Sequence, residues 1–426
     1  MKYFGTDGVR GKFGEEIDKE LSYRVGLAAA SVCGGGEVVV GRDTRVSGEE
    51  LTDALVDGLT RGGCNVRVLG ILPTPAVAHE TVYSGAGLGI MVSASHNPPE
   101  YNGIKIFDSL GYKLGGDVEE KIERLIDNPP SASRLRGRVT HALNPADAYV
   151  NARIEAYKGA LSGITVCLDC AFGAAYEVAG RIFEGCGANV KAYNNEPYGE
   201  KINGDCGALY PEYVLGASKR ENVTLGFAFD GDADRLSVAF GGKIIDGDSV
   251  LYNLYKAVKP QDKMLVGTVL SNMALERKIA KEGGRLIRTD VGDKYVCEKM
   301  RGGGYALGGE QSGHYIISPA TTGDGVLSAL TFAAGLSYGG AIKPPEMLEL
   351  TPQKSISLPA PRSIMESDGI KKLTEKYSEE LKPNGRILVR YSGTEPKIRV
   401  MAESNDISAV DKVLEAFRKF IISYKV

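Results

Sequence analysis

The sequence is poor in histidine and lacks any long apolar run. It has only four histidines in 426 residues, so a histidine inside a polar motif is informative. No segment approaches the roughly 20 apolar residues that a membrane-spanning helix needs. The first residues, M-K-Y-F-G-T-D-G, also lack the apolar core of a signal peptide. We therefore expect a cytoplasmic protein.

Strong charge, a nucleotide loop and paired cysteine motifs are missing as well. A formal net charge of -3 gives no basic footprint, which argues against nucleic acid or an anionic membrane as a partner. No G-x-x-x-x-G-K-[ST] segment is present to support a Walker loop. The seven cysteines are scattered, and Cys167 and Cys170 fall in an apparent strand where they would face opposite sides. We expect reduced, mostly buried thiols.

What the sequence does contain is a repeated strand, helix, strand pattern. The three copies begin at Glu37, Ile164 and Lys263, and their second strands follow glycine turns at Gly62, Gly185 and Gly283. This order is typical of the βαβ unit, in which ligands collect at the carboxyl ends of the strands. Hydrophobic residues make up 43% of the chain, enough for several cores. The pattern predicts three related α/β domains.

The C-terminal part of the sequence does not follow the strand, helix, strand pattern. Proline-rich residues 343–362 separate it from the rest and look like a domain boundary and hinge. Extended segments then begin at Arg386 and Lys397, and a final helix is indicated by apolar residues at helical spacing from Ile407 to Ile421. The tail is predicted to be a small α+β domain.

Two motifs follow apolar strands. The run L-G-I-M-V at Leu88–Val92 leads into S-A-S-H-N-P-P, which places Ser95 and His96 at a strand end. A serine hydrolase is disfavoured there, because no G-x-S-x-G elbow surrounds Ser95 and adjacent residues seldom align as nucleophile and base. The run L-G-F-A-F from Leu225 leads into D-G-D-A-D-R.

Three carboxylates at alternate positions, Asp230, Asp232 and Asp234, would repel each other without a cation, and oxygen ligands suit Mg²⁺. An EF-hand is excluded, because Arg235 and Gly241 stand where glycine and glutamate are required. The block also resembles the haloacid-dehalogenase D-x-D motif. In that alternative mechanism Asp230 would be the nucleophile and Ser95 would be idle.

Two further loops carry polar groups. G-G-E-Q-S-G-H, at residues 308–314, offers a carboxylate, an amide, a hydroxyl and an imidazole, which suit sugar hydroxyls. R-Y-S-G-T-E-P-K-I-R-V, at residues 390–400, places two arginines around a Ser-Gly-Thr turn that suits a phosphate.

These four motifs, with the opening F-G-T-D-G-V-R-G, resemble the α-D-phosphohexomutase superfamily over the whole chain. The resemblance implies an α/β fold of three topologically related α/β domains plus a smaller C-terminal α+β domain around a central cleft. We place these domains at residues 1–146, 147–243, 244–344 and 345–426.

The resemblance also implies roles for residues. Ser95 matches the family phosphoserine, and with Asp230, Asp232 and Asp234 it would hold one Mg²⁺. Lys105 matches the proposed general acid or base, and we expect nearby cations to lower its pKa. The other residues expected around the reacting group are Arg10, Arg235, His96 and His314.

Substrate contacts follow from the two remaining motifs. The sugar would be held by Glu310, Gln311 and Ser312, and the non-reacting phosphate by Arg390, Ser392, Gly393, Thr394 and Arg399. The implied substrate is a hexose or hexosamine monophosphate, with a sugar 1,6-bisphosphate as activator. The sequence does not fix the oligomeric state.

Gln311 and the very early F-G-T-D-G resemble the amino-sugar branch of the superfamily, because mannose and glucose enzymes more often carry methionine at the position of Gln311. The mannose and glucose branches of the superfamily remain alternatives for this sequence. Ala233 departs from the glycine common in D-G-D-G-D, and Tyr391 stands where proline or lysine is frequent. A sugar-phosphate sensor without catalysis would be expected to lack Ser95 or an aspartate, and this chain has both.

Overall fold

The computed structural model describes residues 2–5, 7–34, 36–392 and 396–424. The chain forms two compact units. The first contains Met1–Thr268 and Ile287–Met347, and the second contains Val269–Leu286 and Leu348–Val426. The division at residue 347 falls inside the proline-rich segment predicted as a boundary. The finer division into four domains stays a prediction.

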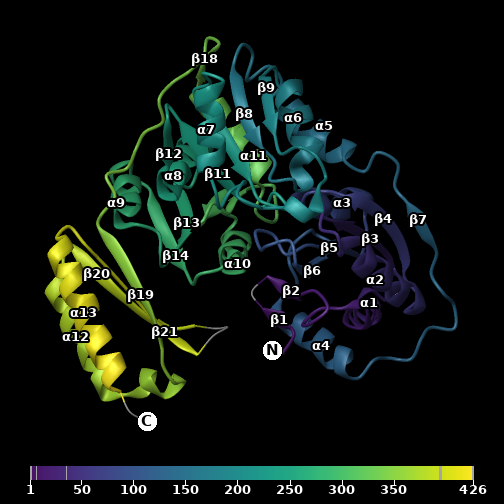
Figure 1. Ribbon diagram of the computed structural model, residues 1–426, viewed down its shortest axis with the longest axis horizontal. Helices are drawn as coiled ribbons and strands as arrows, with labels where there is room; N and C mark the ends of the chain where they lie inside the picture. Colours follow the sequence, from purple (N-terminus) through teal and green to yellow (C-terminus); the bar gives the residue numbers. More distant parts are fainter. Residues whose placement is uncertain (1, 6, 35, 393–395, 425–426) are drawn as a thin grey trace. The chain divides into compact units, whose positions relative to one another are not determined.

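The first sheet of the first unit is mixed (Figure 1). Its strands are, in spatial order, β1 (Phe4–Gly5), β2 (Gly8–Lys12), β6 (Tyr101–Asp108), β5 (Leu88–Val92), β3 (Glu37–Arg42), β4 (Asn65–Ile71) and β7 (Val139–His141). Strand β3 runs parallel to β4 and β5, and its three consecutive valines are buried, as expected for a strand covered on both faces.

Helices cover this sheet. They are α1 (Lys19–Cys33), α2 (Gly48–Arg61), α3 (Thr74–Ser84) and α4 (Gly116–Asp127). Residues of α1, α2 and α4 share one apolar core with the sheet. Helices α1 and α2 approach closely because both carry a glycine at the crossing: a Cβ on Gly26 would lie 2.3 Å from the Leu55 carbonyl oxygen, and one on Gly58 would lie 2.1 Å from that of Tyr23. Side chains at these two positions would force the helices apart.

Two more sheets follow along the chain. The second has the order β12 (Lys243–Ile245), β11 (Leu236–Phe240), β10 (Leu225–Phe229), β8 (Thr165–Asp169) and β9 (Asn189–Tyr193). The third has the order β14 (Arg285–Thr289), β13 (Met264–Thr268), β15 (Leu307–Gly309) and β16 (Tyr315–Ile317). The helices along these segments are α5 (Asp147–Ala156), α6 (Val178–Gly185), α7 (Glu212–Arg220), α8 (Gly247–Val258), α10 (Asp293–Gly303) and α11 (Gly325–Leu336). Short elements complete the unit: the 3-10 turns Ala174–Tyr176 and Gly199–Lys201, and the hairpin of β17 (Ser337–Tyr338) and β18 (Ala341–Ile342).

The predicted strand, helix, strand repeats are present. Strands β3 and β4 are parallel and flank α2, and β8 and β9 are parallel and flank α6. In the third repeat, β13 and β14 are neighbours in their sheet and flank α9 (Met273–Lys281) in the sequence. The mixed α/β class is therefore confirmed.

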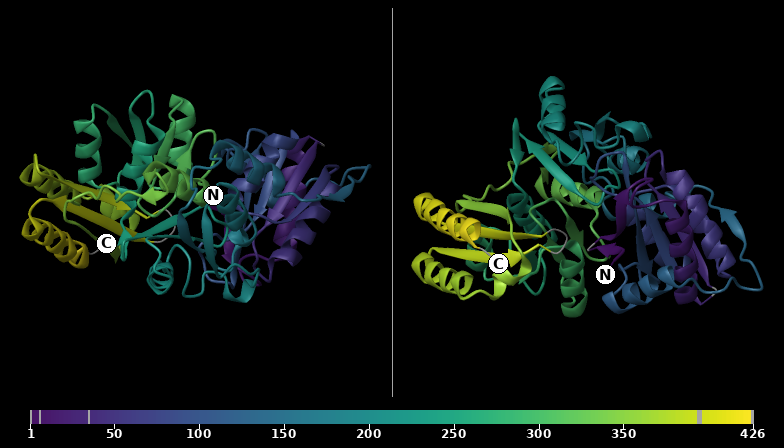
Figure 2. Two further views of the ribbon diagram at one scale, coloured as in Figure 1. Left: turned by 90° about the horizontal axis from the view of Figure 1, so that it is seen from above. Right: turned by 60° about the horizontal axis from the view of Figure 1, so that its bottom comes forward.

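The second unit has an antiparallel sheet in the order β19 (Gln353–Pro359), β21 (Lys397–Ser404) and β20 (Gly385–Tyr391). Helix α13 (Ile407–Ser423) packs on β19 and β21, and α12 (Asp368–Leu381), preceded by the 3-10 turn Arg362–Glu366, packs on β20 (Figures 1 and 2). Helix α9 also belongs to this unit. Its first backbone N–H donates to Glu403 Oε1 at 2.6 Å, and Arg386 Nε donates to Glu403 Oε2 at the same distance. The predicted α+β tail is confirmed.

Two expectations drawn from composition can be compared with the structure. All seven cysteines have free thiols, and five of them are buried, as expected. Within the described ranges, no helix combines the length and apolar character needed to span a membrane.

Candidate active site

Ser95 lies just beyond the carboxyl end of β5, and it is almost fully buried, with 1% of its surface exposed. Its Oγ donates to Asp230 Oδ2 at 2.6 Å and lies 3.3 Å from Asp234 Oδ1. Its φ of 52° is in the left-handed region, which is uncommon for any residue with a side chain. The contacts made by the segment before and after Ser95 hold it in that conformation.

Arg45 is the centre of these contacts. Its side chain is completely buried, and its guanidinium donates to the carbonyl oxygens of Ser95 at 2.8 Å and Asn97 at 2.7 Å. It also donates to the carbonyls of Tyr101, at 2.8 Å, and Pro98. One arginine therefore fixes the whole loop that follows β5.

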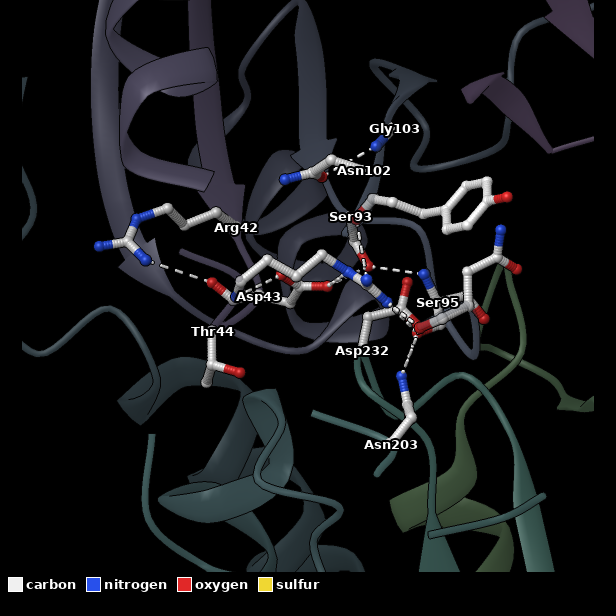
Figure 3. A network of polar contacts seen from close by, with 12 residues as sticks. Arg42, Asp43, Thr44, Ser93, Ser95, Asn102, Gly103, Asn203 and Asp232 are labelled. Atoms are coloured by element: carbon white, nitrogen blue, oxygen red, sulfur yellow. Dashed lines mark hydrogen bonds and ion pairs between the residues drawn. The ribbon is translucent and has the colours of Figure 1, made fainter. Parts of the chain in front are cut away.

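A second set of bonds fixes the Ser95 backbone from both sides (Figure 3). The carboxylate of Asp43 accepts from Arg45 Nε at 2.9 Å and from Ser93 Oγ at 2.7 Å. Ser93 Oγ in turn accepts from the Ser95 N–H at 2.9 Å, while Asn203 Nδ2 donates to the Ser95 carbonyl at 2.9 Å. Glycine is required at position 231, because a Cβ there would lie 2.7 Å from the carbonyl oxygen of Ser95.

The three aspartates follow β10. Asp230, Asp232 and Asp234 are buried, and each offers a carboxylate oxygen within 4.8 Å of the others. Asp232 Oδ2 accepts from Thr74 Oγ1 at 2.6 Å, but Asp232 Oδ1 is buried without a hydrogen-bond partner among the described residues. Burial, and then the charges of Asp234 and Asp232, raise the pKa of Asp230 well above its ordinary value. The cluster thus has an unmet acceptor and excess negative charge, which suit a hard divalent cation.

Lys105 projects from β6 into this cluster. Its Nζ lies 2.8 Å from Asp232 Oδ2, 2.9 Å from Asp234 Oδ2 and 3.3 Å from Asp7 Oδ2. Burial lowers the pKa of Lys105, but the carboxylates of Asp232, Asp234 and Asp7 outweigh it and raise that pKa well above its ordinary value. The lowered pKa expected from the sequence is wrong for this arrangement, because anions and not cations are the nearest charges.

Asp7 connects Lys105 to two more cations. It pairs with Arg10 and with Lys113, and Lys113 also pairs with Asp293. Burial raises the pKa of Asp7, but Lys105, Lys113 and Arg10 outweigh burial and hold it well below its usual range. Arg10 is thereby placed at the edge of the acidic cluster.

The two candidate histidines lie on different sides of the cluster. His96 Nδ1 is 3.3 Å from Ser95 Oγ, closer than expected for adjacent residues. Burial, followed by the charges of Arg235 and Arg10, lowers the pKa of His96 to about 3, so its imidazole is neutral near pH 7. His314 Nδ1 is 3.7 Å from Asp234 Oδ1, and its Nε2 is 3.3 Å from Asp293 Oδ2.

The backbone N–H of Arg235 donates to Asp230 Oδ1 at 3.1 Å, which fixes Arg235 beside the aspartates. The preceding Ala233 has a φ of 57°, so the departure from glycine noted in the sequence carries a backbone strain of about 1–2 kcal/mol.

The loop of residues 308–314, which carries the predicted sugar-binding motif, adjoins the three aspartates through His314. Glu310 Oε1 accepts from the Gly292 N–H at 3.0 Å, whereas Gln311 and Ser312 are exposed. The loop is closed by the Glu310 N–H, which donates to the His314 carbonyl at 2.9 Å. Exposed polar side chains beside a buried charged cluster are arranged as a ligand site requires.

The phosphate motif lies in the second unit. Arg390 of β20 stands directly opposite Arg399 of β21, and both line a cavity of about 270 Å³. Two guanidinium groups on neighbouring strands can bind one phosphate together. The Ser392 N–H donates to the Lys397 carbonyl at 2.8 Å. Gly393 and Thr394 lie outside the described residues.

Comparison with known proteins identifies the family. The chain matches the family models described as phosphoglucomutase/phosphomannomutase, with alpha/beta/alpha domain I at residues 1–133, alpha/beta/alpha domain III at residues 246–353 and the C-terminal domain at residues 355–420. The chain belongs to this phosphohexomutase family. Its members transfer a phosphoryl group within a substrate, so the protein is an isomerase.

Individual relatives support the same assignment. The chain is 43% identical over 427 residues to a phosphoglucosamine mutase of Clostridioides difficile (strain 630), with 95% of each chain covered. It is 39% identical over 437 residues to one of Thermotoga maritima, with 99% of this chain and 100% of that protein covered. Among solved structures, a phosphoglucomutase/phosphomannomutase family protein from Burkholderia thailandensis matches with a TM-score of 0.80 and 26% identity, over 97% of this chain and 96% of that one.

Several residues of this candidate site were not predicted from the sequence. Asp7 lies within the F-G-T-D-G-V-R-G motif, which was used only as a marker of the family. Asp43 and Arg45 follow β3 as Ser95 follows β5, so the same strand-end argument would have found them. Thr74 and Asn203 carry no comparable signal, because only the fold brings them to Asp232 and Ser95.

Proposed function

We propose that the protein is a phosphoglucosamine mutase, which interconverts glucosamine 6-phosphate and glucosamine 1-phosphate in the cytoplasm. The observation that carries this proposal is the Ser95 hydroxyl, buried against three aspartates in a chain about 40% identical, over nearly its full length, to proteins of that name. Four domains with the predicted boundaries are part of the proposal.

Ser95 is proposed to carry the phosphoryl group. Phospho-Ser95 would donate it to the free hydroxyl of the bound monophosphate, forming a 1,6-bisphosphate, and would regain a phosphoryl group from the other position. In each transfer one P–O bond forms as one breaks, and the proton lost by the attacking hydroxyl is balanced by one gained by the departing oxygen. A free sugar 1,6-bisphosphate would activate the enzyme by phosphorylating Ser95. Such transfers depend on positioning and charge neutralisation, which the fixed backbone of Ser95 supports.

Asp230, Asp232 and Asp234, with an oxygen on Ser95, would hold Mg²⁺. The unpartnered Oδ1 of Asp232 and the raised pKa of Asp230 both fit this role. Bound Mg²⁺ supplies a Lewis acid that stabilises charge on the transferring phosphoryl group. A fold neighbour, the Aspergillus fumigatus N-acetylphosphoglucosamine mutase, was solved in complex with GlcNAc-6P and magnesium.

Cations around Ser95 would neutralise the phosphoryl oxygens and move protons. Lys105 is protonated at neutral pH, because its pKa is raised, so it enters as the acid of the first transfer. Arg10 and Arg235 would contact the phosphoserine. His314 is the second candidate for proton transfer, and neutral His96 could accept a hydrogen bond beside Ser95 Oγ.

The remaining predicted residues would bind substrate. Glu310 and Ser312 would hold the sugar hydroxyls, and Gln311 would distinguish the amino sugar. The phosphate that does not react would be held by Arg390, Ser392, Gly393, Thr394 and Arg399. One anchoring loop can serve both orientations of the bisphosphate, because each places one phosphate at the loop and the other at Ser95.

Substrate preference provides the test. Product formation would be followed by NMR with Mg²⁺ and a trace of sugar 1,6-bisphosphate, with glucosamine 6-phosphate, mannose 6-phosphate and glucose 6-phosphate offered separately. We expect kcat/KM for glucosamine 6-phosphate to exceed the others by more than about tenfold, or about 1.4 kcal/mol. A preference for mannose or glucose 6-phosphate would overturn the substrate assignment and leave the reaction class intact.

The phosphoryl carrier is tested separately by intact-mass analysis. We expect a fraction of the purified protein to carry one phosphate at Ser95, and Ser95→Ala to lack both the phosphate and turnover. Stable phosphate on Asp230 instead would favour an aspartyl-phosphate enzyme.

A further inference from the structure

Thr74 bonds twice to Asp232, which lies 158 positions later in the sequence. Its backbone N–H donates to the Asp232 carbonyl oxygen at 2.9 Å, and its Oγ1 donates to Asp232 Oδ2 at 2.6 Å. The hydroxyl is the donor in the second bond, because the carboxylate that pairs with Lys105 can only accept. A distance of 2.6 Å is typical of the strong bonds that hydroxyls make to ionised carboxylates. Thr74 therefore fixes both the main chain and the side chain of this aspartate.

The start of α3 keeps Thr74 in place. Thr74 is the first residue of this helix and is completely buried. The first N–H groups of a helix have no partner within it, so the Thr74 N–H can bond to Asp232 instead. Pro73 and Pro75 each have a fixed φ, and the β-branched side chain of threonine has few favourable rotamers. The hydroxyl is thus held in one direction, toward Asp232.

The two carboxylate oxygens of Asp232 are not equivalent. Oδ2 accepts from Thr74 and from Lys105 Nζ at 2.8 Å, whereas Oδ1 has no hydrogen-bond partner among the described residues. A carboxylate that binds a metal ion is commonly oriented by hydrogen bonds from neighbouring groups. Lys105 also bonds to Asp234, whereas both donors of Thr74 serve Asp232. Thr74 is therefore the neighbour best placed to orient this carboxylate.

The hydroxyl of Thr74 is not needed for packing. Valine has nearly the same shape, so it would fill the same space at the start of α3. A buried hydroxyl is unfavourable unless it is hydrogen-bonded, and the partner here is a carboxylate oxygen of the proposed metal site. The chemical difference between threonine and valine at position 74 thus falls on Asp232.

We propose that Thr74 is a positioning residue for the metal site: its hydroxyl holds Asp232 Oδ2 and leaves Oδ1 for Mg²⁺. The N-terminus of α3 acts in the same direction, because the aligned peptide dipoles of a helix favour a negative charge at that end. This role rests on the metal site proposed above, and it is independent of which sugar the protein prefers.

The test measures Mg²⁺ binding by isothermal titration calorimetry, with full-length protein whose Ser95 is unphosphorylated. Thr74→Val removes the hydroxyl but keeps the shape of the side chain and the backbone N–H. We expect this variant to bind Mg²⁺ about 10- to 100-fold more weakly than the unsubstituted protein, the usual effect of losing a group that orients a metal ligand. Thr74→Ser retains the hydroxyl and should retain most of the affinity.

Thr81→Val is the matched control. Thr81 lies in the same helix and is equally buried, but its Oγ1 donates to the Val77 carbonyl oxygen at 2.8 Å. Its substitution should leave the Mg²⁺ affinity unchanged, even where both valine variants melt at a lower temperature. Thermal unfolding checks that each variant is folded, and Thr74→Ala replaces Thr74→Val if the latter is not.

The dependence of turnover on Mg²⁺ provides a second readout. Because Thr74 would act through the ion, a higher Mg²⁺ concentration should restore the kcat of Thr74→Val, and KM for glucosamine 6-phosphate should change little. A loss of turnover that Mg²⁺ does not restore overturns the role of Thr74, as does a folded Thr74→Val that binds Mg²⁺ as tightly as the unsubstituted protein. If the unsubstituted protein binds no Mg²⁺, the metal site itself is overturned and this role with it.

Discussion

Two buried charged groups on either side of Ser95 are paired to different extents. In the first group, Arg45 has an acceptor for each of its five N–H groups: the Asp43 carboxylate and the carbonyls of Ser95, Asn97, Pro98 and Tyr101. In the second group, Lys105 bridges Asp232 and Asp234. Asp232 Oδ1 nevertheless has no partner among the described residues, and the pKa of Asp230 is raised. The first group is complete within the chain, whereas the second is incomplete.

This difference distinguishes charges that support the fold from charges that we propose take part in the reaction. A buried charge is tolerated when hydrogen bonds replace the water it has lost, as they do around Arg45. The Mg²⁺ that we propose would supply what a cluster with an unmet oxygen and mutual repulsion lacks. Two variants test whether the two groups behave in these different ways, and a third tests the neutral His96 beside Ser95.

The largest effect is expected from Arg45→Met. It leaves Asp43 as a buried charge without its cation and releases four carbonyls, so the free energy of unfolding should fall by about 3–5 kcal/mol. Urea denaturation measures this loss. Arg24→Met, which breaks the exposed Arg24–Glu20 pair, is the control and should cost less than about 0.5 kcal/mol. Equal losses in the two variants would mean that Arg45 is not the structural centre of the loop.

Asp232→Asn should act on turnover more than on the fold. The amide keeps one oxygen but removes the charge, and we expect kcat to fall by about 10²-fold, or about 2.7 kcal/mol of transition-state stabilisation. Added Mg²⁺ should raise the Tm of the unsubstituted protein and have little effect on the variant. If Mg²⁺ stabilises both equally, the ion does not bind at this cluster.

The smallest effect concerns His96 and pH. The unfolded chain takes up a proton near pH 6.5, but the folded chain, with a pKa of about 3, does not. This contribution to stability is therefore complete above about pH 6.5 and is lost as the pH falls toward about 3, by at most about 1.4 kcal/mol per pH unit. Urea denaturation between about pH 7 and pH 5, with Ser95 unphosphorylated, should give a shallower slope for His96→Gln. Parallel slopes would contradict the buried, neutral histidine.

The sequence was most informative where chemistry follows an apolar strand. Ser95 and the aspartates were predicted to lie at strand ends, and the structure brings Ser95 Oγ within 2.6 Å of Asp230, which is 135 residues away in the sequence. The sign of the Lys105 pKa shift could not be predicted, because it depends on which charges are nearest, and spacing along the chain does not reveal that. Arg45 also follows a strand, but its role could not be predicted for a related reason: its partners are carbonyls of residues about 50 positions later, which any sequence could supply.

The left-handed backbone at Ser95 has a consequence for engineering. Glycine adopts this conformation with less strain than serine, so a library selected for thermal stability alone would tend to enrich Ser95→Gly. Such a selection would discard the hydroxyl on which the proposed reaction depends. Screens for thermally stable variants of this protein should therefore keep Ser95 unchanged or measure turnover as well as the melting temperature.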